Sequence, residues 1–176
     1  GLSSIGKLPW LHLSAGDTVR IHYRPEPYRE KWVICAAGKE GAPITFTGVP
    51  GVEGKLPVID GREAVASNLL DYWNGNRGVI KIGGANVPRD TTPAHIVIRS
   101  LIIRGGNGDN SYVDRRGRSA YRKNAAAIYI EKGVNILVEN CTLLDSGNGL
   151  MVAHESRDIT VRGCQIYGNG NPKSVY

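Results

Sequence analysis

The sequence predicts an all-β fold, a right-handed parallel β-helix (solenoid) of about four coils with an N-terminal cap. The main observation is a repeat: "NILVENCTLLDSGN" begins at Asn135, and "DITVRGCQIYGNGN" begins 23 residues later at Asp158. A third copy, "HIVIRSLIIRGGNG", begins at His95, 40 residues before the first. Repeats that each bury an apolar face only by stacking on neighbours are typical of solenoids.

Each copy contains two short strands. Apolar residues alternate with polar ones up to a polar kink, resume the alternation, and end in a turn rich in Gly, Asn and Asp. The kink lies at Ser100, Asn140 and Gly163 in the three copies. A further set of segments, around 79–84, 126–132 and 149–155, also superposes and supplies a third strand to each coil.

The repeat also predicts which residues stack. Matched apolar positions in adjacent coils should pair in parallel register, with all side chains buried. The pairs are Ile136 with Ile159, Val138 with Val161, and Leu143 with Ile166. Cys141 and Cys164 should be unbridged neighbours, because stacked apolar thiols in a core are more often free. On the second sheet, Arg99, Glu139 and Arg162 should form a stabilising charge ladder.

We expect a single domain, in which residues 1–42 form the cap and residues 43–176 form the coils. Residues 62–78 read as a polar and aromatic excursion that is partly helical. Because the chain stops just after a turn, at Tyr176, we expect an amino-terminal part of a longer solenoid. Its partners would then include further carboxy-terminal coils of the same protein.

Composition favours anionic partners, since the formal net charge is +6 and the sequence pI is about 9.3. The sequence carries no nucleic-acid-binding signature and no apolar run long enough to span a membrane. The three cysteines leave the compartment open.

The strand alternation gives candidate binding residues. With Ile80 and Ile82 facing inward, Lys81, Tyr129 and Met151 form one outward row. Glu131 follows Tyr129 by two residues, in the next outward row, and His154 follows Met151 by three, near the end of its strand. Aromatic and charged groups in such a track suit sugar rings and carboxylates. The alternative is that Lys81 and Glu131 pair diagonally while Tyr129 and Met151 cover the strand.

A 17-residue insertion around 109–123 interrupts the repeat before the Tyr129 strand, so it should lie beside the outward track. Arginine recognises carboxylates through a planar fork, and solenoid insertions often line the binding face. The alternative is a solvated loop. The candidate substrate-binding residues here are Arg115, Arg116, Arg118, Tyr121 and Arg122.

The alternating coils, the "GDTVRI" entry and "APITFTGVPG…LPVIDG" resemble right-handed parallel β-helix proteins of the pectate-lyase-like superfamily. The resemblance implies a secreted or periplasmic protein of bacterial type that acts on polysaccharides. That superfamily includes lyases, hydrolases, epimerases and non-catalytic surface proteins, so the fold alone does not give the chemistry.

The resemblance leads us to expect part of an extracytoplasmic, polysaccharide-acting protein that is a polyuronate lyase when complete, with an anionic polysaccharide as partner. Alternatives are a non-catalytic carbohydrate-binding or adhesin solenoid, or a glycoside hydrolase. Such lyases use a Lys or Arg base, with Ca²⁺ or another cation masking the carboxylate. No acidic cluster for Ca²⁺, no pair of Asp residues for hydrolysis and no catalytic motif can be assigned here. The 176-residue chain alone is expected to be inactive.

Overall fold

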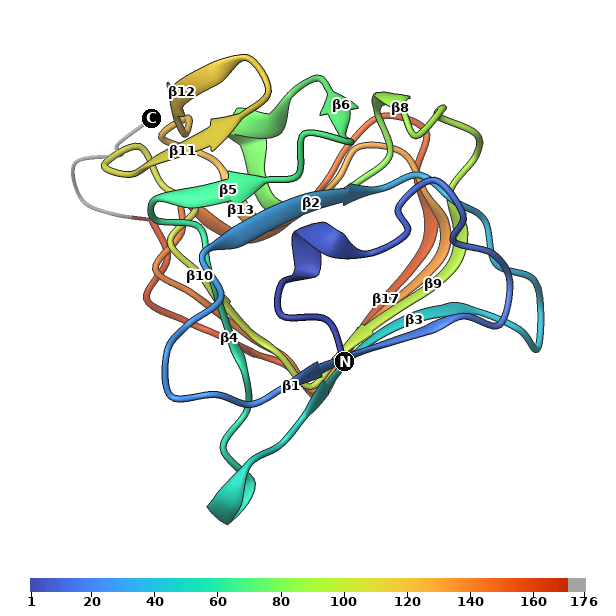
Figure 1. Cartoon of the computed structure of the whole chain (residues 1–176), viewed down its shortest axis with the longest axis horizontal. Helices are drawn as coiled ribbons and strands as arrows, with labels where there is room; N and C mark the ends of the chain where they lie inside the picture. The colour runs from blue at the N-terminus through green and yellow to red at the C-terminus, as the bar shows by residue number, and fades with distance from the viewer. Residues whose placement is uncertain (171–176) are drawn as a thin grey trace.

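The structure is a computed structural model that describes residues 1–170 and contains no α-helix in that range. Three largely parallel sheets run side by side and enclose an apolar core, which Figure 1 shows end-on. The predicted fold class, a parallel β-helix, is confirmed. Among the described residues, no helix is long and apolar enough to cross a lipid bilayer. The helical elements are the 3-10 turns η1 (Ile5–Lys7), η2 (Val52–Gly54) and η3 (Gly75–Arg77).

The strands are distributed over three main sheets and one small pair. The five-stranded sheet contains, in spatial order, β1 (Thr18–His22), β3 (Ile44–Val49), β9 (Ala94–Arg99), β14 (Val134–Glu139) and β17 (Arg157–Arg162). The four-stranded sheet contains β18 (Gln165–Ile166), β15 (Thr142–Leu144), β10 (Ile102–Arg104) and β4 (Val58–Asp60). The seven-stranded sheet contains β12 (Gly117–Ala120), β11 (Ser111–Asp114), β5 (Ala64–Ala66), β2 (Glu30–Ile34), β7 (Gly78–Ile82), β13 (Ala126–Ile130) and β16 (Asn148–Val152). The small antiparallel pair is β6 (Asp71–Tyr72) and β8 (Ala85–Val87).

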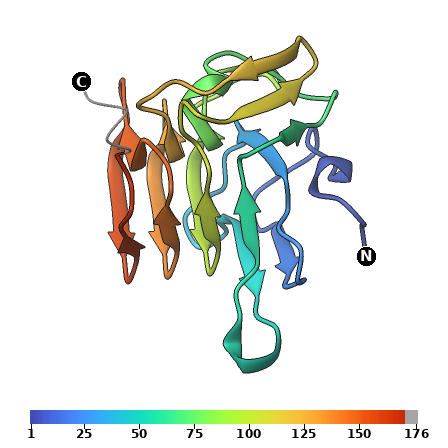
Figure 2. The same ribbon diagram turned by 90° about the vertical axis from the view of Figure 1, so that its left-hand side faces the viewer.

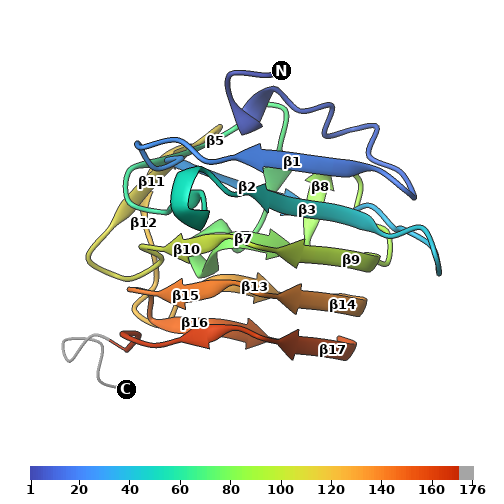
Figure 3. The ribbon, with the colours of Figure 1, turned by 90° about the horizontal axis from the view of Figure 1, so that it is seen from below.

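The coils stack as the repeat predicts, and Figure 3 shows β9, β14 and β17 lying one above another. All three predicted pairs, including Leu143 with Ile166, are in parallel register. The prediction that all six side chains are buried is wrong for the last coil. Ile159 is half-buried, whereas Val161 and Ile166 are exposed, because no further coil covers β17 and β18 within residues 1–170.

The polar kinks are left-handed corners. Ser100, Asn140 and Gly163 have φ angles of 57°, 51° and 62°. Left-handed backbone is unfavourable for most L-residues but is tolerated by Gly and by short polar residues, which explains the residue types at the kink. Two further equivalent positions in each repeat also have positive φ: His95, Asn135 and Asp158, and Gly105, Asp145 and Gly168.

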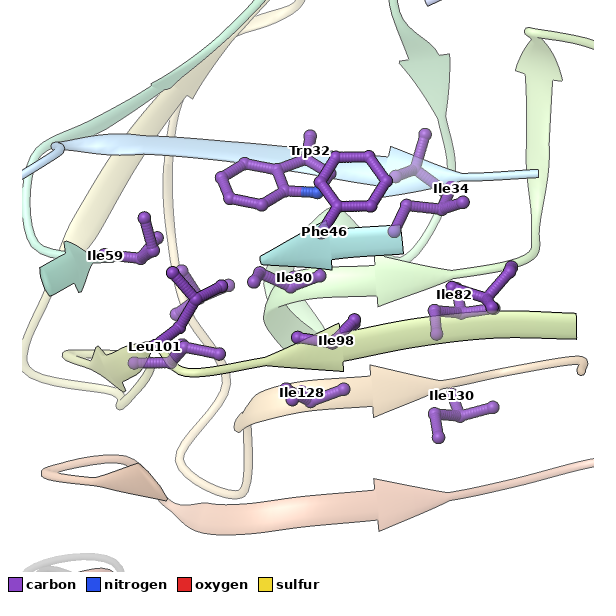
Figure 4. Close-up of a cluster of buried hydrophobic side chains, with 14 of the residues drawn as sticks. Trp32, Ile34, Phe46, Ile59, Ile80, Ile82, Ile98, Leu101, Ile128 and Ile130 are labelled. Carbon is purple, nitrogen blue, oxygen red and sulfur yellow. The ribbon is translucent and has the colours of Figure 1, made fainter. Parts of the chain in front are cut away.

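The core is a column of apolar side chains closed by aromatic rings at its first end. In Figure 4 isoleucines such as Ile80 and Ile128 line the column, with Trp32 and Phe46 above them. Trp10 packs on Phe46 with the ring centroids 6.0 Å apart. The segment before β1, which contains Trp10, lies across this end of the stack (Figure 1), while β1 and β2 already pair in parallel with coil strands.

The two departures from the repeat are ordered. Residues 62–78 form β5, β6 and the single 3-10 turn η3, so the expected helical content is limited to that turn. The 109–123 insertion forms an antiparallel hairpin of β11 and β12, which joins the seven-stranded sheet through β5. Figure 2 shows this hairpin, in gold, above the stacked coils. Buried Lys31 anchors it, since its Nζ atom lies 3.7 Å from the Tyr112 ring centroid.

The cysteines are free, as expected: Cys141 is buried and Cys164 half-buried. The predicted charge ladder forms only in part. A guanidinium nitrogen of Arg162 lies 2.9 Å from Oε1 of Glu139, whereas Arg99 donates to the Thr47 hydroxyl. Both residues of the ion pair are on the outer surface, so the contact contributes little to stability.

Candidate functional site

The outward row of the seven-stranded sheet has the predicted register but not the predicted exposure. Lys81, Tyr129 and Met151 pair side by side on β7, β13 and β16. Lys81 and Tyr129 are nevertheless buried, and Met151 is half-buried. The excursion 62–78 contributes to this cover: Nζ of Lys81 lies 5.6 Å from the Trp73 ring, and the Arg77 guanidinium lies 5.9 Å from the Tyr129 ring. The prediction of an open track over these residues is therefore wrong.

Lys81 and Glu131 form a buried ion pair, which is the alternative that the sequence left open. Their Nζ and Oε2 atoms are 2.5 Å apart, and Nζ also donates to the Gly84 carbonyl at 2.9 Å. Burial lowers the pKa of Lys81, and the Glu131 carboxylate opposes that shift. With no exposed surface, the ammonium group is not available to a ligand.

The second oxygen of Glu131 organises the outer surface. Oε1 accepts hydrogen bonds from Trp73 Nε1 and Asn74 Nδ2, each at 3.0 Å. Nε2 of His154 lies 3.9 Å from the same oxygen. The indole of Trp73 is thus held in place, although the residue remains 41% exposed.

Beside this indole the surface forms a hollow of about 370 Å³. Its lining residues are Trp73, Gly84, Asp90, Glu131, Lys132, His154 and Glu155. We call this the Trp73 hollow. Among the predicted site residues, Glu131 and His154 belong to it, and Lys81 lies beneath Glu131.

Trp73, Asp90, Lys132 and Glu155 were not among the residues predicted from the sequence to form the site. One signal was present for Trp73, because a tryptophan inside a polar excursion has no place in the repeating core. Asp90 could not be found in this way, since only the folded chain brings it beside Glu131.

The hairpin was expected beside the outward track; in the structure it pairs with β5 of the excursion, and part of its charge is already paired. Arg116 forms an ion pair with Asp71 and donates to the Tyr72 carbonyl at 3.0 Å. Arg118 lies 2.6 Å from a carboxylate oxygen of Glu63.

Tyr121 is not a surface residue. It is buried against Lys31, and its hydroxyl donates to the Gly61 carbonyl at 2.8 Å. Arg115 and Arg122 are exposed. Of the predicted hairpin residues, Arg116, Arg118 and Tyr121 therefore make structural contacts. Arg115 and Arg122 are the ones that a ligand can reach.

The Ca²⁺ ion that the resemblance implies does not fit the side chains present. Within the described part of the chain there is no group of three or more His, Cys, Asp or Glu residues that could hold a metal. Ca²⁺ takes six to eight oxygen ligands. In the Trp73 hollow, the Glu131 oxygens are already engaged by the Lys81 ammonium and by two N–H donors.

No protein-family model, curated protein or solved structure matches this chain. The fold and the site together define a parallel β-helix with a small hollow, walled by a fixed aromatic ring and polar side chains, on the outer face of its coils. Its function has to be inferred from that geometry.

Proposed function

We propose that the protein is a carbohydrate-binding β-helix and that a sugar unit of a polysaccharide binds in the Trp73 hollow. One observation carries the proposal: the half-exposed indole of Trp73 is fixed by its hydrogen bond to Glu131 at the wall of the hollow. A sugar ring presents a C–H face that packs on an aromatic face and hydroxyls that need polar partners. Concave sites with an apolar wall and a few polar groups are the usual form of ligand pockets.

The fixed ring lowers the entropic cost of binding, because a side chain that is already ordered loses little freedom when a ligand arrives. Asp90 and Glu155 can accept hydrogen bonds, and His154 and Lys132 add donor capacity at the rim of the hollow. The site thus combines one stacking surface with several hydrogen-bonding groups, which is what a polyhydroxylated ring requires.

The anionic character of the polysaccharide stays a prediction that depends on the hairpin. Arg115, Arg122 and Lys123 are exposed and supply the positive charge that the 109–123 insertion presents to solvent. Arg116 and Arg118 contribute less, since Asp71 and Glu63 already neutralise them. Affinity for uronate-containing chains would then be modest and would fall as the salt concentration rises.

Of the expected functions, the geometry supports the binding of a polysaccharide rather than a reaction on it. The polyuronate-lyase hypothesis needs a lysine or arginine that reaches the substrate, and Lys81 is covered. The lyase, hydrolase and adhesin alternatives, and an extracytoplasmic location, remain hypotheses from the resemblance alone.

A panel of oligosaccharides tests the proposal. Neutral, uronate and amino-sugar oligomers are titrated into the protein by calorimetry, and the uronate samples are also followed for the absorbance of an unsaturated product. We expect saturable binding of at least one class. A Leu69→Ala variant is the control, because Leu69 is also an exposed apolar residue of the same excursion but lies outside the hollow. Absence of binding across the panel would overturn the proposal.

A further inference from the structure

The charges that line the Trp73 hollow are opposite in sign to those of the hairpin. Three carboxylates, those of Asp90, Glu131 and Glu155, face one lysine, Lys132, and one histidine. The Lys81 ammonium neutralises Glu131 from beneath, which leaves the Asp90 and Glu155 charges in excess over Lys132. A carboxylate-bearing sugar would be repelled at this position.

Asp90 adds an independent observation. Its Oδ1 atom is buried and has no hydrogen-bond partner. Asp90 also acts on Cys35: burial raises the pKa of the thiol first, and the charge of Asp90 and a hydrogen bond to its side chain raise that pKa further. Asp90 is thus in contact with Cys35 on the interior side, while the residue as a whole is half-buried and lines the hollow.

The Trp73 indole favours the same type of ligand. The face of an indole attracts cations within about 6 Å of its centre. The half-exposed indole therefore offers a cation a favourable surface beside the carboxylates. The half-exposed aromatic face and the excess of carboxylates over ammonium groups both suit a ligand that carries a protonated amine.

We infer that the Trp73 hollow binds an amino sugar with a free, protonated amine, as a unit of the polysaccharide. The inference rests on the proposed carbohydrate-binding function and names the ligand class. The ammonium group donates to Asp90 and Glu155, while the ring packs on Trp73. The polysaccharide that fits both regions carries amines at the hollow and carboxylates at the hairpin.

Three oligosaccharides of equal length, β-1,4-linked, test the inference because they differ only at the C2 substituent: glucosamine, N-acetylglucosamine and glucose. Calorimetric titration is done at a slightly acidic pH, where the amine is protonated. We expect the glucosamine oligomer to bind on the order of tenfold more tightly than the other two, which is about 1.4 kcal/mol. Since the protein carries a formal charge of +6, overall electrostatic attraction cannot produce this preference for a cation.

Two variants test whether the preference for the glucosamine oligomer arises in the Trp73 hollow. Glu155→Gln should reduce it several-fold without affecting folding, because Glu155 is exposed. Asp90→Asn should reduce it as well, while Glu40→Gln, an exposed carboxylate outside the hollow, should leave it unchanged.

The outcomes separate the inference from the proposed function. Equal binding of all three oligomers, or a preference unaffected by Glu155→Gln and Asp90→Asn, overturns the amino-sugar inference and leaves carbohydrate binding standing. If uronate oligomers bind in the hollow and glucosamine oligomers do not, the amino-sugar inference is also overturned, and carbohydrate binding again stands. Failure of every sugar to bind overturns both.

Discussion

Lys81 and Glu131 form an ion pair that joins two neighbouring coils beneath the surface of the molecule. Nζ of Lys81, on β7, lies 2.5 Å from Oε2 of Glu131, which directly follows β13. Because Oε1 of Glu131 also holds Trp73, a single carboxylate links the coil stack to the candidate site.

Glu131→Gln should destabilise the protein by several kcal/mol, roughly 3–5, because it leaves the buried Lys81 ammonium without a counter-charge. Urea unfolding followed by circular dichroism measures the effect. The double variant Lys81→Met, Glu131→Gln should be less destabilised than Glu131→Gln alone. Equal stability of wild type and Glu131→Gln would show that the pair does not form.

Leu143→Ala should lower the free energy of unfolding by roughly 2–5 kcal/mol, since the rigid stack cannot close the cavity that the smaller side chain leaves. Ile166 is the matched control, because it pairs with Leu143 in register but is 49% exposed. Ile166→Ala should cost less than about 1 kcal/mol by the same reasoning on buried area. Equal costs would contradict the observed end of the stack.

Gly163→Ala should cost on the order of 1–2 kcal/mol, because Gly163 has a φ angle of 62° and the added Cβ disfavours left-handed backbone. That Cβ would also lie 2.5 Å from the side-chain oxygen of Asn140. Thr160→Ala, an exposed position in the adjacent strand β17, is the control and should change stability little. Chemical denaturation of both variants measures the difference.

Burial raises the pKa of the Cys141 thiol to about 12 from its usual 9.0. The unfolded chain therefore loses this proton at a lower pH than the folded chain, so stability declines as the pH rises from about 9 towards 12. One such group contributes a slope of about 1.4 kcal/mol per pH unit inside that window. Cys141→Ala should flatten the slope by that amount, and an unchanged slope would contradict the burial of the thiol.

The fold could be predicted from the sequence because the repeat is local information. The 23-residue offset gives the register of β14 on β17, and the residue types at Ser100, Asn140 and Gly163 give the corners. The burial of the last coil could not be predicted, since it depends on what covers Ile159 and Ile166 rather than on their own pattern.

The candidate site could be predicted only in part. Alternation correctly placed Lys81 and Tyr129 outward, and it could not show that another segment covers them. The path of the excursion 62–78 depends on long-range contacts, such as Trp73 with Glu131 and Asp71 with Arg116, which follow no period. Glu131 and His154 were identified, whereas Asp90 was not, because its place in the hollow arises from tertiary structure alone.

The most direct test of the carbohydrate-binding account is the tryptophan emission of the protein during titration with the tightest-binding oligosaccharide. Trp10 and Trp32 are buried in the core, so a change in emission reports on Trp73. We expect a saturable change that Trp73→Ala abolishes, with at least about a tenfold loss of affinity by calorimetry, while Leu69→Ala behaves as wild type. Unchanged affinity in a folded Trp73→Ala variant would contradict the account, because the sugar would then bind elsewhere.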